Sequence, residues 1–218
     1  MTGASAQMAA ARDTVLVGGG GHACVVADML ASLGRRVRGF VAPSRGARLD
    51  GMAWLGGDDV LERLAPGTTD IALGIGSTGD AALRRGIFDI LVRRGHAFPP
   101  LVHPSAHLAR SVSLGAGAQV MLGAAVQAGV VLDANSIVNT GAIVDHDCHI
   151  GAHAHVAPGA VLCGDVRVGD GAHVGAGARI LQGVRVGATA LIGAGAVVLC
   201  DVPQGVRVAG VPAREMRP

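Results

Sequence analysis

The sequence is poor in aromatic residues: among its 218 residues there are no tyrosines, one tryptophan and three phenylalanines. Large aromatic side chains supply much of the buried area in most globular cores, so a core of that kind is not expected. Half of the residues are nevertheless apolar, and 35 are glycine. This composition favours a core of many small, similar layers made from Val, Ile, Leu and Ala.

The sequence also lacks a strong net charge and a long hydrophobic run. A formal charge of +2, without a basic block interleaved with aromatics, argues against a nucleic-acid partner. The longest apolar run, residues 191–200, is far shorter than the roughly 18 residues of a membrane span. Because the N-terminus has neither the positive start nor the leucine-rich core of a signal peptide, we expect a disordered lead-in before Asp13 and a cytoplasmic protein.

Paired cysteine spacings such as C-x-x-C are absent as well. Spacings of that kind mark disulfide frameworks and zinc sites. We therefore expect reduced and mostly buried thiols at the four cysteines, Cys24, Cys148, Cys163 and Cys200.

Up to residue 98 the chain alternates strand-like and helix-like segments. Alternation of this kind predicts βαβ units around a small parallel sheet. Prolines in "HAFPPLVHP" then break the pattern, so we predict a small Rossmann-like α/β domain over residues 13–98 and a second domain over 105–218. The expected strands are 14–18, 36–42 and 70–76, and the expected helices are 21–34, 58–64 and 81–94.

From residue 108 to residue 198 every sixth residue is Leu, Val or Ile. No helix has a period of six, whereas a hexapeptide repeat is the signature of a parallel β-helix. Stacked aliphatic side chains can fill such a narrow prism without aromatics. The sixteen positions are Leu108, Leu114, Val120, Val126, Leu132, Val138, Val144, Ile150, Val156, Leu162, Val168, Val174, Ile180, Val186, Ile192 and Val198.

The repeat also predicts which residues lie side by side on the outside of the prism. Three faces of six residues give coils of about 18 residues. His155 should then lie beside His173, and His149 should lie in a column with Arg167 and Arg185.

A glycine-rich segment, "GGGGHA" at residues 18–23, lies between the first expected strand and the first expected helix. It fits G-x-G-x-x-A through Gly18, Gly20 and Ala23, and backbone amides at such a helix N-terminus favour phosphate. A nicotinamide site would also need an acidic residue at the end of the second strand. Ala42 and Pro43 stand there, so NAD is not expected.

A second segment, "NTGAIVDHDCHIGAHAH" at residues 139–155, holds four histidines. It could form a metal site, a catalytic base or an exposed polar corner. Imidazole titrates at a pKa of ~6.5, and a carboxylate such as Asp147 or Asp145 would orient His146 and raise its basicity. Zinc could be bound by imidazole and thiolate, but the spacing lacks a ligand signature, so no metal is expected. The candidate ligands are His146, Cys148, His149, His153 and His155.

Five segments together resemble a known family: "VLVGGGGHACVV", "LVHPSA", "VNTGAIVDHDCHIGAHAHVAPGA", "IGAGAVV" and "VAGVPAR". They look like the sialic-acid O-acetyltransferase and nucleotide-4-amino-sugar N-acetyltransferase family of hexapeptide acyltransferases. The likeness covers nearly the whole chain after residue 13. It implies a left-handed β-helix and a homotrimer whose active sites lie between neighbouring β-helices, with acetyl-CoA along the prism and a nucleotide sugar held by the N-terminal domain.

The reaction that this resemblance implies is acetylation of the 4-amino group of a UDP- or GDP-linked 4-amino-4,6-dideoxy sugar. O-acetylation of sialic acid or a related sugar hydroxyl is the alternative enzyme, and a non-catalytic β-helix scaffold is the alternative class. The implied catalytic residues are His146 and Asp147. The implied contacts are Gly20, Gly21, His22, Gly57 and Asn139 for the substrate, and His155, Gly164 and Ala176 for acetyl-CoA.

Several of these assignments have structural alternatives. Asn139 can equally turn a β-helix corner, and the glycines can serve simple turns. The His155 N–H, or a local backbone N–H, could stabilise an oxyanion, whereas His149 and His153 are expected to be bystanders.

The sequence departs from the family at Ala42 and Pro43, where the family commonly has acidic residues that read the nucleotide. The base identity therefore stays open, with Ser44, Arg45 or Arg48 as possible replacements. Arginines along the β-helix either meet CoA phosphates or form a solvated face; they are Arg167, Arg179, Arg185, Arg207 and Arg214.

Overall fold

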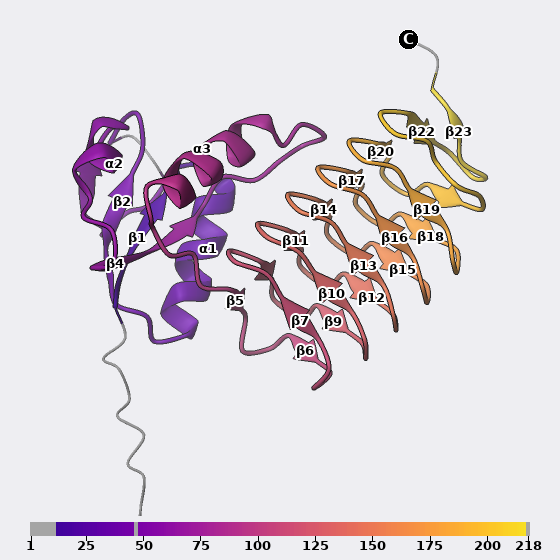
Figure 1. Ribbon diagram of the computed structural model, residues 1–218, viewed down its shortest axis with the longest axis horizontal. Coiled ribbons are helices and arrows are strands. Elements are labelled where there is room, and N and C mark those ends of the chain that lie inside the picture. Colours follow the sequence, from indigo (N-terminus) through magenta and orange to yellow (C-terminus); the bar gives the residue numbers. More distant parts are fainter. Residues whose placement is uncertain (1–11, 46–47, 217–218) are drawn as a thin grey trace, which may run out of the picture.

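A small α/β unit packs against one end of a long β-helix in the computed structural model of the protein (Figure 1). The structure describes residues 12–45 and 48–216, so the expected lead-in lies almost entirely outside the described residues. Within the described part of the chain, no helix has both the length and the hydrophobicity needed to cross a bilayer.

The α/β unit is a four-stranded parallel sheet in the order β3-β2-β1-β4. The three predicted strands and three predicted helices are confirmed, with ends shifted by a few residues. The sequence did not predict the short edge strand β3, which has no apolar alternation. The elements are β1 (Asp13–Val17), α1 (Gly21–Ser32), β2 (Val37–Val41), β3 (Trp54–Gly56), α2 (Asp59–Arg63), β4 (Thr69–Leu73) and α3 (Ala82–Arg93).

The central strand β1 shows why this sheet forms. Its apolar residues are buried on both faces, as expected for a parallel strand covered by helices. Leu16 packs with the α1 residues Val26 and Leu30, whereas Val15 and Val17 pack on the opposite face, in the cluster that includes Phe88 of α3. Because α1 begins only a few residues after β1 ends, the carboxyl end of β1 lies next to the N-terminus of α1.

The β-helix has three parallel sheets of two-residue strands. Each predicted hexad residue is the second residue of a strand, and its side chain fills the interior of the prism. The strands are β5 (Leu101–Val102), β6 (His107–Leu108), β7 (Ser113–Leu114), β8 (Gln119–Val120), β9 (Ala125–Val126), β10 (Val131–Leu132), β11 (Ile137–Val138), β12 (Ile143–Val144), β13 (His149–Ile150), β14 (His155–Val156), β15 (Val161–Leu162), β16 (Arg167–Val168), β17 (His173–Val174), β18 (Arg179–Ile180), β19 (Arg185–Val186), β20 (Leu191–Ile192), β21 (Val197–Val198), β22 (Arg207–Ala209) and β23 (Arg214–Glu215).

The predicted register of the coils is confirmed. His155 pairs with His173, and His149 pairs with Arg167, which pairs with Arg185. The repeat begins one hexad earlier than predicted, because β5 already pairs with β8 inside the proline-rich segment. At the other end, β23 folds back antiparallel on β22.

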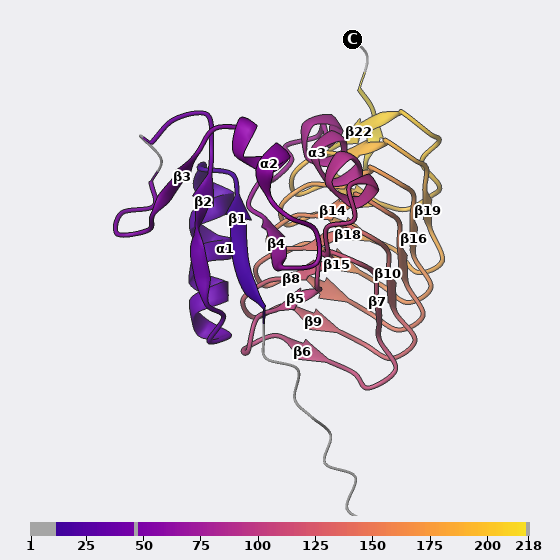
Figure 2. The same cartoon turned by 60° about the vertical axis from the view of Figure 1, so that its left-hand side comes forward.

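The two parts of the molecule share a packed junction on one face of the prism (Figure 2). Met121 and Ile137 of the β-helix belong to the same buried cluster as Leu16 of β1. The Phe88 ring of α3 meets His153 edge-on, with centroids 5.7 Å apart. This junction fixes the loops at the end of the α/β sheet against coils of the β-helix.

The four cysteines are free thiols, but only Cys148 is buried. The expectation of mostly buried thiols is therefore wrong. Cys24 and Cys163 are partly exposed and Cys200 is exposed, because Cys24 lies on the first turn of α1 and the other two lie in the turns after β15 and β21. Cys148 lies two residues before the hexad residue Ile150, at a position whose side chain belongs to the interior cluster.

We predict that substitutions on β10 separate inward from outward residues of the same strand. Leu132 is 1% exposed and its neighbour Val131 is 37% exposed. Leu132→Ala should lower the free energy of unfolding by about 2–5 kcal/mol because it leaves a cavity in the prism. The control, Val131→Ala, should cost less than about 1 kcal/mol. Urea unfolding at one protomer concentration measures both, and equal losses would contradict the inward assignment.

Candidate active site

His146 and Asp147 lie at the corner between β12 and β13. The His146 Nδ1 atom is 2.9 Å from Asp147 Oδ2, and about half of each side chain is exposed. Asp147 has a left-handed backbone, with φ of 60°, a conformation that aspartate tolerates better than most residues. Asp145 instead accepts the backbone N–H of His146 at 2.8 Å. Of the two candidate carboxylates, Asp147 therefore holds the ring.

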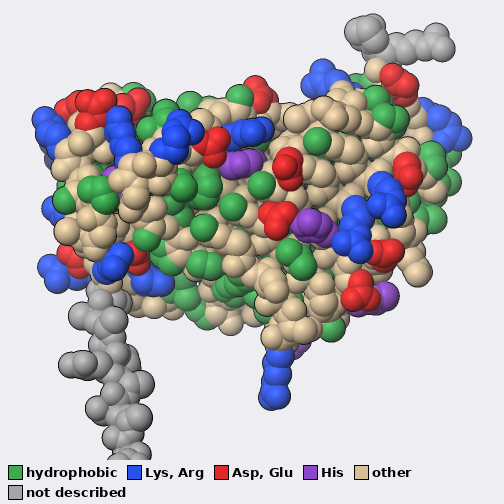
Figure 3. All heavy atoms as spheres, in the orientation of Figure 1, with side chains coloured by type: hydrophobic (Ala, Val, Ile, Leu, Met, Phe, Trp, Pro, Cys, Tyr) green, Lys and Arg blue, Asp and Glu red, His purple; other side chains and the backbone are tan. Residues whose placement is uncertain are grey.

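The hydrogen bond between His146 Nδ1 and the Asp147 carboxylate determines the tautomer of the imidazole. With Nδ1–H donating to the carboxylate, Nε2 carries the lone pair. The pKa of His146 is raised, chiefly by the hydrogen bond to Asp147 and further by the negative charges of Asp145, Asp147 and Asp165. The corner thus presents an exposed imidazole of raised pKa. In Figure 3, histidine, acidic and basic side chains lie together on the face of the β-helix that is turned toward the viewer.

Glycines in the two neighbouring coils leave room for this pair. A β-carbon on Gly164 would lie 2.5 Å from His146 Nε2 and 2.6 Å from Cε1, and one on Gly129 would collide with Asp147 Oδ1. Gly164 does not have a positive φ, so it is required for space rather than for backbone conformation. The imidazole and its carboxylate partner therefore fit between Gly129 and Gly164.

A cavity of about 650 Å³ lies between the α/β unit and the β-helix. The α/β unit contributes the start of α1 and the loop after β4; the β-helix contributes the corner after β11. The first backbone N–H groups of a helix have no partner within the helix, so the α1 N-terminus offers donors here. The predicted residues that line the cavity are Gly20, Gly21, His22, Asn139 and His155.

Hydrogen bonds hold the His155 ring in a fixed orientation in the lining of this cavity. Asn139 Oδ1 accepts the Thr140 N–H at 2.8 Å, so its Nδ2 donates to His155 Nε2 at 2.9 Å. His155 Nδ1 lies 3.0 Å from the Ser77 carbonyl oxygen and donates to it. Burial lowers the pKa of His155 to about 3, so the ring stays neutral. Both ring nitrogens are engaged, so this imidazole has no free N–H for an oxyanion, and the backbone alternative remains.

His22 is held in the same way from the other side of the cavity. Gln119 donates from Nε2 to the Leu73 carbonyl oxygen at 2.9 Å, which leaves its Oε1 to accept from His22 Nε2 at 3.0 Å. Burial lowers the pKa of His22 to about 4. Gln119 is an outward residue of β8, so its hydrogen bonds to His22 and Leu73 join the β-helix to the α/β unit.

A second cavity of about 430 Å³ continues along the face of β14, β17 and β20. It shares Ser77, Asn139 and His155 with the first cavity, so the two form one groove. Small residues such as Ala176 line its far end. The groove can therefore accept an extended ligand through backbone groups.

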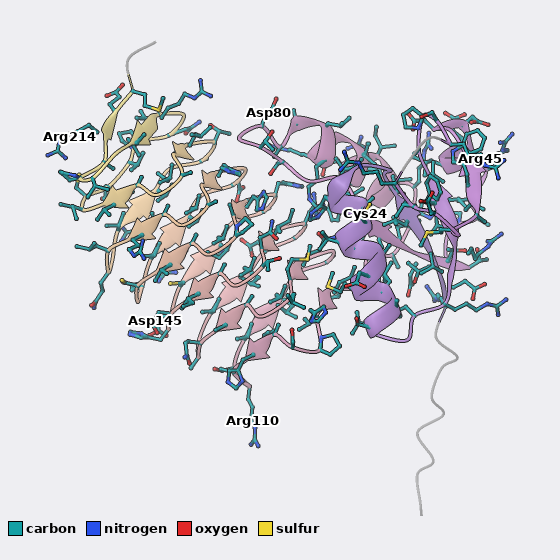
Figure 4. The ribbon with its side chains drawn as sticks, turned by 180° about the vertical axis from the view of Figure 1, so that it is seen from behind. Cys24, Arg45, Asp80, Arg110, Asp145 and Arg214 are labelled. Carbon is teal, nitrogen blue, oxygen red and sulfur yellow. The ribbon has the colours of Figure 1, made fainter. Side chains whose placement is uncertain are left out.

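Two of the predicted contacts, Gly57 and Gly164, lie outside this groove. Gly164 lies against His146, and Gly57 follows β3 without lining either cavity. His146 also lines neither cavity, because it lies at the β12–β13 corner whereas Asn139 lies at the β11–β12 corner. In Figure 4, Asp145 marks the first corner and Asp80 marks the loop above the groove. Within one chain, the His146 imidazole and the groove are thus separated by one face of the prism.

The four histidines of this segment do not converge. His149 Nε2 lies 2.6 Å from Asp133, and His153 Nδ1 lies 3.0 Å from the Asn135 amide nitrogen. Among the residues that the structure describes, no three His, Cys, Asp or Glu side chains are grouped to hold a metal ion. His153 is a buried residue of the domain junction, next to Phe88.

The groove is not lined by the residues that were considered for recognition of the nucleobase, Ser44, Arg45 and Arg48. The Ala42 carbonyl accepts the Trp54 indole N–H at 3.0 Å, and the Arg48 carbonyl accepts the Cys24 thiol at 3.3 Å.

Ser77 and Gln119, which hydrogen-bond the two buried histidines of the groove, were not predicted as site residues from the sequence. The glycine-rich "GIGSTGD" at the end of the third expected strand was a usable signal for Ser77, since ligands bind where parallel strands end.

We predict that Gly164→Ala lowers kcat by at least about tenfold, because the added β-carbon displaces the base from its position. The acetyl-CoA and acceptor KM values should change much less than kcat, and the melting temperature should stay close to that of the wild type. Steady-state kinetics with both substrates test this. A kcat equal to that of the wild type would show that the space beside Gly164 is not needed.

Two family models match the chain. The PglD N-terminal domain matches residues 13–91, and the six-repeat bacterial transferase hexapeptide matches residues 147–182. None of the curated proteins compared with the chain matches it.

Solved structures match nearly the whole chain. The acetyltransferase domain of PglB from Neisseria gonorrhoeae FA1090 is 39% identical with a TM-score of 0.89, covering 94% of this chain and 100% of that one; it is also known in complex with acetyl coenzyme A. PerB from Caulobacter crescentus, in complex with CoA and GDP-perosamine, is 38% identical with a TM-score of 0.87, covering 94% and 97%. A perosamine N-acetyltransferase from the same organism, with a histidine replaced by asparagine, binds the same two molecules.

These matches confirm the predicted left-handed parallel β-helix behind a Rossmann-like domain. The chain belongs to the hexapeptide-repeat family of acetyl-CoA-dependent N-acetyltransferases of nucleotide-linked 4-amino sugars.

Proposed function

We propose that the protein transfers the acetyl group of acetyl-CoA to the 4-amino nitrogen of a UDP- or GDP-linked 4-amino-4,6-dideoxy sugar. The observation that carries this proposal is the His146–Asp147 pair on an exposed corner, where the His146 Nε2 atom has no hydrogen-bond partner among the described residues. A sugar ammonium must lose a proton before or during attack on the thioester. His146 Nε2 takes that proton, and Asp147 stabilises the imidazolium that forms.

The groove supports the binding of two substrates. The first cavity offers the N-terminus of α1, around Gly20 and Gly21, to the diphosphate of the nucleotide sugar. The second cavity offers small residues and backbone groups to CoA. The two cavities meet at Asn139, where a sugar amine and a thioester would come together.

A backbone donor for the oxyanion lies next to the base. The Gly164 N–H makes no hydrogen bond to any described residue and lies beside the His146 ring. Donors positioned where negative charge develops stabilise the tetrahedral intermediate. In this proposal Gly164 contacts the acetyl group through its backbone, and Ala176 lies further along the CoA path.

The separation of His146 from the groove supports a homotrimer. Between the two corners lies the sheet of β6, β9, β12, β15, β18 and β21, whose outward residues include the exposed Ile143 and the partly exposed Val161 and Val197. If this face meets two neighbours around a threefold axis, His146 of one chain reaches the groove of the next. The active site is then complete only in the assembly.

The proposed reaction predicts thiol release from acetyl-CoA with UDP- or GDP-linked 4-amino sugars and none with free sialic acid. His146→Ala should lower kcat by about 10²–10⁴-fold through loss of the base. His149→Ala is the control, because His149 is also exposed and paired with a carboxylate but lies outside the site. Turnover with sialic acid alone would contradict the N-acetyltransferase assignment, and full activity of His146→Ala would contradict the base role.

The Asp147 hydrogen bond predicts a shift in the pH profile. His146 acts as a base only when neutral, so activity falls as the pH drops through its raised pKa. Asp147→Asn removes the largest cause of that increase, so the acid limb of kcat/KM should move to lower pH while the plateau falls. Profiles between about pH 5.5 and 9 measure the shift. An acid limb that stays in place would show that another group titrates.

A further inference from the structure

Arg84 is a buried cation without a carboxylate partner among the described residues. It lies on α3 and is 1% exposed. Its Nη1 atom donates to the Leu73 and Ile75 carbonyl oxygens, its Nε donates to the Asn135 carbonyl oxygen at 3.4 Å, and its Nη2 has no partner. Burial of an unpaired charge is costly, and an apolar residue of similar size would avoid that cost. The guanidinium is therefore expected to have a function.

The first cavity lacks positive charge of its own. No lysine or arginine lines it among the described residues, and its one carboxylate is Asp80. His22 and His155 are neutral because burial lowers the pKa of each. A nucleoside diphosphate carries at least about two negative charges. Arg84 lies directly behind the cavity wall, because it donates to the carbonyl oxygen of Ile75, a residue that lines the cavity.

Arg84 also sets the direction of a peptide in that wall. The C=O and N–H of a trans peptide point in opposite directions. Because the Ile75 carbonyl points at Arg84, the Gly76 N–H points away from it. Gly76 lines the cavity, and its N–H makes no hydrogen bond to any described residue. Backbone N–H groups oriented in this way bind anions.

We infer that Arg84 is a positioning residue for the substrate diphosphate: it turns the Gly76 N–H toward the cavity and supplies the positive charge that the cavity lining lacks. This inference rests on the proposed function. Arg84 does not touch the substrate; it acts through the loop after β4 and through the electrostatic potential of the cavity.

The test compares Arg84→Gln and Arg84→Lys with the wild type. The control is Arg85→Gln, which removes the same charge from an exposed position on the same helix. Arg84→Gln should raise the nucleotide-sugar KM and the Kd of the free nucleotide, UDP or GDP, at least about tenfold, and Arg84→Lys should raise them less. The kcat at saturation and the acetyl-CoA KM should stay within about twofold of the wild type. A merely structural role would change those two as well, and that result would overturn the inference, as would an unchanged nucleotide Kd in folded Arg84→Gln.

A second pair of variants keeps the inference testable if the Arg84 variants do not fold. Gly76→Pro deletes the N–H, whereas Gly76→Ala adds a β-carbon near His22 and keeps the N–H. Weaker nucleotide binding by Gly76→Pro than by Gly76→Ala is expected, and equal binding would overturn the inference. If the wild type bound neither UDP nor GDP, the proposed function itself would fail, which distinguishes the two failures.

Discussion

The register of the coils is the constraint on which the rest of the structure depends. An aliphatic residue at every sixth position fills the prism and places residues 18 apart in direct contact on its outside. A side chain at one corner therefore meets the corresponding corner of the next coil and little else. His146 illustrates this, because its ring lies against Gly164 of the following coil. Space for the base thus depends on a residue of no chemical reactivity.

The site combines two kinds of histidine, and the surroundings of each set its protonation. His146 is exposed beside carboxylates, which raise its pKa. His22 and His155 are buried at the domain junction, where their pKa values fall to about 4 and about 3. The first is suited to accept a proton near neutral pH. The other two stay neutral, and their hydrogen bonds to Gln119, Asn139 and Ser77 hold the groove in shape.

The repeat, the α/β alternation and the His146–Asp147 pair could be predicted from the sequence, because each depends on local spacing. What the sequence could not predict depends on contacts between distant residues. Gln119 reaches His22 across 97 positions, and Ser77 reaches His155 across 78. Because Ser77 is so far from His155 in the sequence, the sequence alone left an oxyanion role for the His155 imidazole open. Its partners became known only with the fold.

The role of Arg84 and the separation of His146 from the groove could not be predicted from the sequence, for the same reason. Both depend on how the α/β unit packs on the prism and on which corner each hexad reaches. The separation also carries the central claim, that the base of one chain serves the groove of a neighbour. Co-expression of His146→Ala with Asn139→Ala tests it most directly. Random trimers should regain roughly a quarter of wild-type activity, because one site in four would combine an intact base with an intact groove. Mixed trimers no more active than either variant alone would contradict a shared site.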